Sequence, residues 1–149
     1  MGNKITAWLF RSRSRYSDAA ILVIRIVIGI TYIVRGYPKI IGGSERWLAI
    51  GTRISVIGIE FGYTFFGFLA SFSEFFGGMA LLIGLFTRLS TVGIGFTMII
   101  AALSHITHGD SITRILHPLE LLAVCLFLYF NGAGRFSVDH LLKQKIFTK

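Results

Sequence analysis

Residues 71–88 read SFSEFFGGMALLIGLFTR, an apolar run that carries a single acid, Glu74. Gly77 and Gly78 follow one helical turn after this acid, and Arg88 closes the run. If the run spans a bilayer, a charged side chain near its centre costs about 2.5–3.5 kcal/mol on insertion scales. Glu74 must therefore be protonated, paired with a cation or turned toward a polar cavity. The glycine pair allows a second helix backbone to approach closely.

The composition is that of a membrane protein. The chain has 149 residues, of which 54% are hydrophobic and only 15% are charged, whereas about 25% are charged in a typical soluble domain. Its basic residues outnumber the acidic ones by 15 to 7. They sit mainly at the ends of apolar runs, which indicates membrane topology and not a nucleic-acid surface. The single Cys125 excludes an intramolecular disulfide mechanism.

Four apolar runs predict four membrane-spanning helices in one domain. We expect them at about 18–34, 63–86 and 91–106, with the last beginning between Ser111 and His117 and ending at Phe130. Gly36-Tyr37-Pro38 is expected to end the first span, and 87–90 to form the turn between spans two and three. The lipid bilayer is thus the first expected partner, and no nucleic-acid partner is expected.

The connection at 42–62 predicts a short amphipathic helix at the membrane interface. Ser44 is a favourable N-cap. Apolar residues then recur on one helical face, at Trp47, Ile50, Ile54 and Ile57. The predicted fold class is therefore all-α, a four-transmembrane-helix bundle with a short amphipathic interfacial helix between spans one and two.

The distribution of basic residues predicts the orientation. Nine lie on the side that holds both termini and the 87–90 turn, and five lie on the opposite side: Arg35, Lys39, Arg46, Arg53 and Arg114. This bias places both termini in the cytoplasm, and the first apolar run reads as an uncleaved anchor. We divide the chain into a cytoplasmic basic N-terminal segment (1–17), a four-helix membrane domain (18–142) and a basic cytoplasmic tail (143–149).

Glu74 and Arg25 are candidates for an intramembrane polar site. They could form a buried ion pair, although antiparallel packing makes Arg25 lean toward the cytoplasm and Glu74 away from it. Alternatively, Glu74 is kept protonated by desolvation, which suits a quinone headgroup or a proton relay. A third interpretation is a structural polar contact that fixes the register of the helices.

A second group of candidates lies where spans three and four meet. His105 and His108 share one helical face, as do His117 and Glu120. Two such pairs on adjacent helix ends could bind a metal or exchange protons. The alternative is a set of interfacial histidines near a loop, and we predict no metal site. Arg35 should lie on the same side and could pair with Glu120.

The stretch NGAGRFSVD at 131–139 predicts a helix stop and a restart. It contains Gly-x-Gly but lacks the third glycine and the Lys-Ser/Thr pair of phosphate loops. Ser137 is expected to cap a short helix, with Asp139 near the positive end of that helix.

Three motifs, taken in order, resemble the DoxX family of small four-helix membrane proteins. They are RIVIG at 25–29 with GYPK at 36–39, EFFGG at 74–78 with TR at 87–88, and GAGRFSVD at 132–139. Glu120 also matches an acid often found in the last span of this family. The resemblance covers about residues 20–142, so that 18–142 is predicted to be a DoxX-like domain.

The resemblance implies a multi-pass inner-membrane protein linked to quinone-dependent chemistry. We therefore expect a membrane subunit or anchor of a quinone-linked redox or oxidative-stress complex, with its polar site around Glu74. The implied cofactor is a non-covalent quinone, and a protein partner is expected to carry the redox chemistry. A homo-oligomer is one option for its assembly, and catalysis by the chain itself is left open. The alternatives are a small-molecule or proton-coupled carrier and a non-catalytic membrane scaffold.

Overall fold

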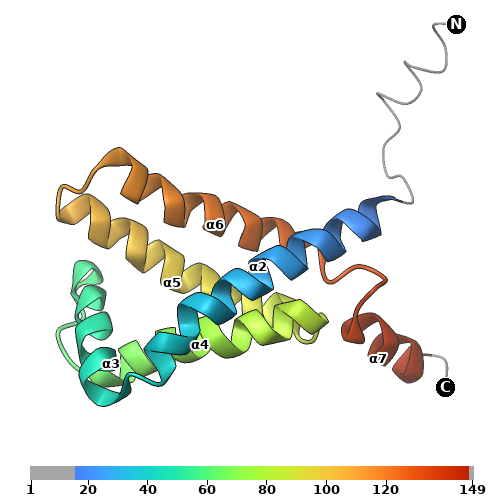
Figure 1. Ribbon diagram of the computed structural model, residues 1–149, viewed down its shortest axis with the longest axis horizontal. Coiled ribbons are helices and arrows are strands. Elements are labelled where there is room, and N and C mark those ends of the chain that lie inside the picture. The colour runs from blue at the N-terminus through green and yellow to red at the C-terminus, as the bar shows by residue number, and fades with distance from the viewer. Residues whose placement is uncertain (1–15, 148–149) are drawn as a thin grey trace, which may run out of the picture.

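The computed structural model describes residues 16–147, which form helices and no strand. The predicted N-terminal segment, 1–17, lies outside the described residues except at its end. The elements are α2 (Tyr16–Ile40), α3 (Gly43–Gly51), the 3-10 helix η1 (Thr52–Ile57), α4 (Tyr63–Ile83), α5 (Thr87–Thr107), α6 (Ile112–Asn131) and α7 (Val138–Phe147). In length and composition, α2, α4, α5 and α6 can each cross a membrane. The predicted four-span all-α fold, with a short helix between the first two spans, is confirmed (Figure 1).

The long helices pack in sequence, with α2 along α4, α4 against α5, and α5 against α6. Figure 1 shows α5 and α6 as a hairpin that diverges from the crossed pair α2 and α4 toward the end where α3 lies. There α3 packs on α4, and η1 reaches α5. At the opposite end α7 lies beyond the last turn of α4 (Figure 1). We call these two ends the α3 end and the α7 end.

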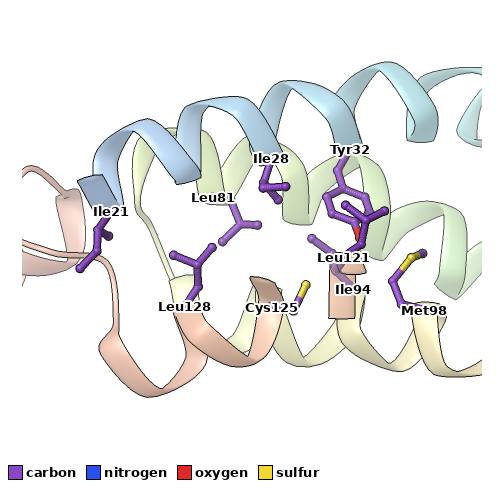
Figure 2. Packing of buried hydrophobic residues seen from close by; sticks show 9 residues of the cluster. All are labelled: Ile21, Ile28, Tyr32, Leu81, Ile94, Met98, Leu121, Cys125 and Leu128. Atoms are coloured by element: carbon purple, nitrogen blue, oxygen red, sulfur yellow. The ribbon is translucent and has the colours of Figure 1, made fainter. Parts of the chain in front are cut away.

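Apolar side chains from all four long helices meet in one core. Figure 2 shows that this core comprises Ile21, Ile28 and Tyr32 of α2, Leu81 of α4, Ile94 and Met98 of α5, and Leu121, Cys125 and Leu128 of α6. The exposed faces of the same helices are also rich in large apolar side chains. That pattern is expected of helices whose outer surface faces lipid.

Glycines bring α2 and α4 into close contact. A Cβ atom placed on Gly78 would lie 2.9 Å from the backbone nitrogen of Ile33. One placed on Gly36 would lie 2.5 Å from the backbone nitrogen of Phe75. Neither position has room for a side chain, so the prediction that the glycine pair admits a neighbouring helix backbone is confirmed for Gly78.

The expected end of the first span is wrong, because α2 continues through Gly36-Tyr37-Pro38 to Ile40. A proline in the last turn of a helix removes only one backbone hydrogen bond. The tight contact of Gly36 with α4 holds this turn in place. Because the helix continues, Lys39 is part of α2 and lies one turn beyond Arg35.

The expected cap of the short helix and the expected turn after span two are also wrong. Ser44 lies inside α3, which begins at Gly43 and has no side-chain cap. The turn after α4 falls at Gly84–Phe86, where Gly84 and Phe86 have φ values of 72° and 48°. Residues 87–90 instead form the first turn of α5. A glycine in the left-handed conformation ends a helix at little cost, which explains the stop at Gly84.

We expect Gly78→Ala to destabilise the protein by about 1–3 kcal/mol, because the added methyl group overpacks the α2–α4 contact. Gly95→Ala is the matched control, since a Cβ atom there would lie an ordinary 3.5 Å from Leu122 Cδ1. Both substitutions gain helix propensity, so only the contact differs. Thermal unfolding in one detergent compares the two variants, and equal midpoints would contradict the proposed packing.

Candidate functional site

A cavity of about 990 Å³ lies at the α3 end of the bundle. It is lined by residues of six elements, namely α2, α3, η1, α4, α5 and α6. Its lining is apolar at positions such as Phe66, Leu69 and Phe96. Its ionisable lining residues are Arg35, Lys39, Arg46, Arg53, Glu74, His105, Arg114 and His117. The volume is that of a small-molecule site.

Glu74 lies in the wall of this cavity as one half of an ion pair. Lys39 Nζ donates a hydrogen bond to Glu74 Oε2 over 2.5 Å. The Glu74 side chain is only 4% exposed, and that of Lys39 is 23% exposed. Sequence reasoning did not identify Lys39 as the partner. Because helical side chains lean toward the N-terminus of their helix, Glu74 points to the α3 end, where the continued α2 presents Lys39.

Arg25 lies apart from Glu74 and contacts backbone carbonyls instead. Its Nε and Nη2 atoms donate to the carbonyls of Leu81 and Leu82 over 2.9 and 3.2 Å. Its Nη1 atom donates to the carbonyls of Ala133 and Phe136 over 2.6 and 2.9 Å. The residue is 1% exposed. The considered pair between Arg25 and Glu74 is not formed.

These four carbonyls explain how a buried guanidinium is tolerated. Leu81 and Leu82 lie in the last turn of α4, where unpaired carbonyls form the negative end of the helix dipole. Ala133 and Phe136 belong to the connection between α6 and α7. Arg25 therefore joins α2, the end of α4 and the α6–α7 connection, a structural role at the α7 end.

The α6–α7 connection is a helix stop and a capped restart, as predicted. Gly132 and Gly134 have φ values of 75° and 72°. Ser137 Oγ accepts a hydrogen bond from the backbone N–H of His140 over 3.2 Å, which is an N-cap of α7. The connection begins with a glycine turn and ends with this cap.

Asp139 lies in the first turn of α7, as predicted, and it also contacts the start of a second helix. Its carboxylate accepts hydrogen bonds from the backbone N–H groups of Phe86 and Thr87, over 2.8 and 3.0 Å. These groups open α5, so the carboxylate caps α5 as well as lying in the first turn of α7. Asp139 also donates its own N–H to the Gly84 carbonyl over 2.9 Å. These bonds account for the start of α5 at Thr87.

Each histidine candidate contacts a different partner. His105 Nδ1 lies 2.8 Å from Asp110 Oδ2, and Arg114 Nη1 donates to Asp110 Oδ1 over 3.0 Å. The hydrogen bonds from His105 and Arg114 hold the pKa of the Asp110 carboxyl below its usual value. His108 Nδ1 lies 2.6 Å from the Ser104 carbonyl and closes the end of α5.

Arg35 contacts His117 and not Glu120. Its Nη1 atom lies 2.5 Å from His117 Nε2. Glu120 is exposed, and within residues 16–147 no hydrogen bond or ion pair joins its side chain to another residue. In the same range, no group of three or more His, Cys, Asp or Glu side chains could hold a metal ion.

The cavity brings together only part of the predicted set. Among the candidates it is lined by Glu74, Arg35, His105 and His117, whereas Arg25, Glu120 and His108 are not in its lining. Sequence reasoning gave the remaining cations of the lining no site role. It used Lys39, Arg46, Arg53 and Arg114 as topology markers, and Lys39 also as part of a family motif. The sequence contained a signal for these residues. Together with Arg35 they make five basic residues, which is many for the side of a small membrane protein that carries fewer of them.

We expect Arg25→Gln to destabilise the protein by about 3–5 kcal/mol, the range for breaking a buried charged interaction. Glutamine cannot reach all four carbonyls, which would then be buried without donors. Arg135→Gln is the control, because the Arg135 side chain is 78% exposed and makes only a surface ion pair with Asp18. Thermal unfolding measures both, and a similar loss in the two variants would contradict the structural role of Arg25.

Comparison with known proteins agrees with this architecture. The family model named DoxX matches residues 20–108. The chain is 30% identical over 139 residues to the inner membrane protein YqjF of Escherichia coli (strain K12), covering 88% of this chain and 98% of that relative. No solved structure matches the chain. The chain is an integral membrane protein of the DoxX family.

Proposed function

We propose that this protein is a membrane subunit or anchor of a quinone-linked redox or oxidative-stress complex, and that its cavity binds the quinone headgroup. The observation that carries the proposal is the Lys39–Glu74 ion pair in the wall of a cavity of about 990 Å³. A buried acid and a cation beside open volume can bind a polar headgroup. Apolar neighbours such as Phe66, Leu69 and Phe96 suit its ring and tail.

The pair supplies what a quinone headgroup requires. The Lys39 ammonium can donate a hydrogen bond to a quinone carbonyl oxygen. Reduction of a quinone to a quinol takes up two electrons and two protons, and Glu74 would take each proton from water and pass it to the headgroup. The electrons are assigned to a protein partner, and the membrane subunit binds and orients the quinone.

The proposed location is the inner membrane, with both termini in the cytoplasm. The inner-membrane relative supports the location, and the excess of basic residues beside the termini supports the orientation. The α7 end then lies at the cytoplasmic face and the cavity lies near the opposite face. A quinone could reach this cavity from the lipid.

We expect Glu74→Gln to weaken binding of a short-chain quinone analogue by about tenfold, which corresponds to about 1.4 kcal/mol. The amide keeps the shape of the side chain but loses the charge that positions Lys39. Titration of the purified protein in detergent with decylubiquinone, followed by tryptophan fluorescence, measures the affinity. Glu60→Gln is the matched control, because Glu60 is exposed and lies outside the cavity lining.

A double variant, Lys39→Gln/Glu74→Gln, separates binding from folding. It removes both charges, so it should recover stability lost when one partner of a buried pair is removed. Binding should stay weak in this variant. The quinone assignment fails if the wild type does not bind the analogue, or if Glu74→Gln lowers stability without changing binding. Either result favours the scaffold interpretation. Substrate flux in liposomes without redox partners would instead identify a carrier.

A further inference from the structure

The cavity carries more positive charge than its carboxylates can balance. All five basic residues of the α3 end line it, namely Arg35, Lys39, Arg46, Arg53 and Arg114. Lys39 is paired with Glu74, and Arg114 with Asp110. The structure gives the other three no carboxylate partner within residues 16–147.

Arg46 and Arg53 are the two basic residues that most clearly lack a partner. Arg46 lies on α3 and Arg53 on η1, and both are exposed in the cavity lining. Within the described part of the chain neither side chain makes a hydrogen bond or ion pair. Arg35 adds a third guanidinium from α2, and its contact is the His117 ring. Three guanidinium groups from three elements thus line one cavity. Most of their N–H donors make no hydrogen bond within the described residues.

We propose that Arg35, Arg46 and Arg53 form an anion-binding subsite for a phosphate, sulfate or carboxylate group. The planar guanidinium presents paired N–H donors that match the oxygens of such groups. Like charges around a cavity with low-dielectric walls raise the local potential, and a bound anion relieves their repulsion. The anion is either that of a free small molecule or the headgroup of an anionic lipid that enters from the membrane.

Cationic residues near a membrane face are often only solvated there, or contact lipid phosphates without a defined site. Here the cations of the α3 end all line a single cavity, although they come from four separate elements. Apolar lining from Phe66, Leu69 and Phe96 lies in the same cavity. The anionic ligand can therefore carry an apolar part. The three arginines line the same cavity as the Lys39–Glu74 pair but are different residues, so the anion proposal does not depend on the quinone proposal.

The test uses the full chain in nanodiscs of phosphatidylcholine, without quinone and at low ionic strength. One arm titrates inorganic phosphate by calorimetry. The other adds phosphatidylglycerol to the nanodiscs and measures its retention against phosphatidylcholine by native mass spectrometry. Arg46→Gln/Arg53→Gln should weaken anion binding about tenfold or more. Because both side chains are exposed and unpartnered, this variant should unfold at the wild-type temperature. If it does not fold, the single variants replace it, each with a smaller loss.

Arg88→Gln/Arg135→Gln is the matched control, since it removes two exposed arginines at the α7 end. Phosphate binding that is lost only in the cavity variant identifies a free anion. Preferential retention of phosphatidylglycerol that is lost only there identifies a lipid headgroup. No anion binding in either arm, or an equal loss in the control, overturns the proposal. Glu74→Gln should retain anion binding. A failure of the quinone proposal can therefore be distinguished from a failure of the anion proposal.

Discussion

The buried Arg25 guanidinium is the interaction on which the α7 end depends. It donates to two carbonyls at the end of α4 and to two in the α6–α7 connection. A charge buried in this way is stable only while its hydrogen bonds remain, so the two segments cannot move independently of α2. Asp139 adds the start of α5 to the same cluster. These polar contacts join the segments at this end.

The α3 end is built on the opposite principle. There the long helices diverge (Figure 1), and the space between them is a cavity with a surplus of cations. The buried Arg25 guanidinium at the α7 end is hydrogen-bonded to four carbonyls, whereas the Arg46 and Arg53 side chains at the α3 end make no hydrogen bond or ion pair within residues 16–147. This contrast is why we assign structure to one end and ligand binding to the other.

The basic residues of this chain therefore have two different roles. The predicted orientation compared the number of basic residues at the α3 end with the number on the side predicted to be cytoplasmic. It treated all of them as topology signals. The structure places every one of those five in the cavity lining. The proposed ligand sites account for their number without reference to insertion. Four of the five supply the charge of the proposed sites, Lys39 in the quinone site and Arg35, Arg46 and Arg53 in the anion site.

The sequence by itself determined the four-helix membrane fold, the close helix contact at Gly78 and the cap at Ser137, because hydrophobic periodicity, glycine content and capping depend on local chemistry. It also singled out Glu74 as an acid in need of a partner. Only the tertiary structure decided that Lys39 is this partner and that Arg25 binds carbonyls, because both contacts depend on how antiparallel helices are packed. The cavity likewise required the structure, since its lining comes from six elements spread over residues 35–118.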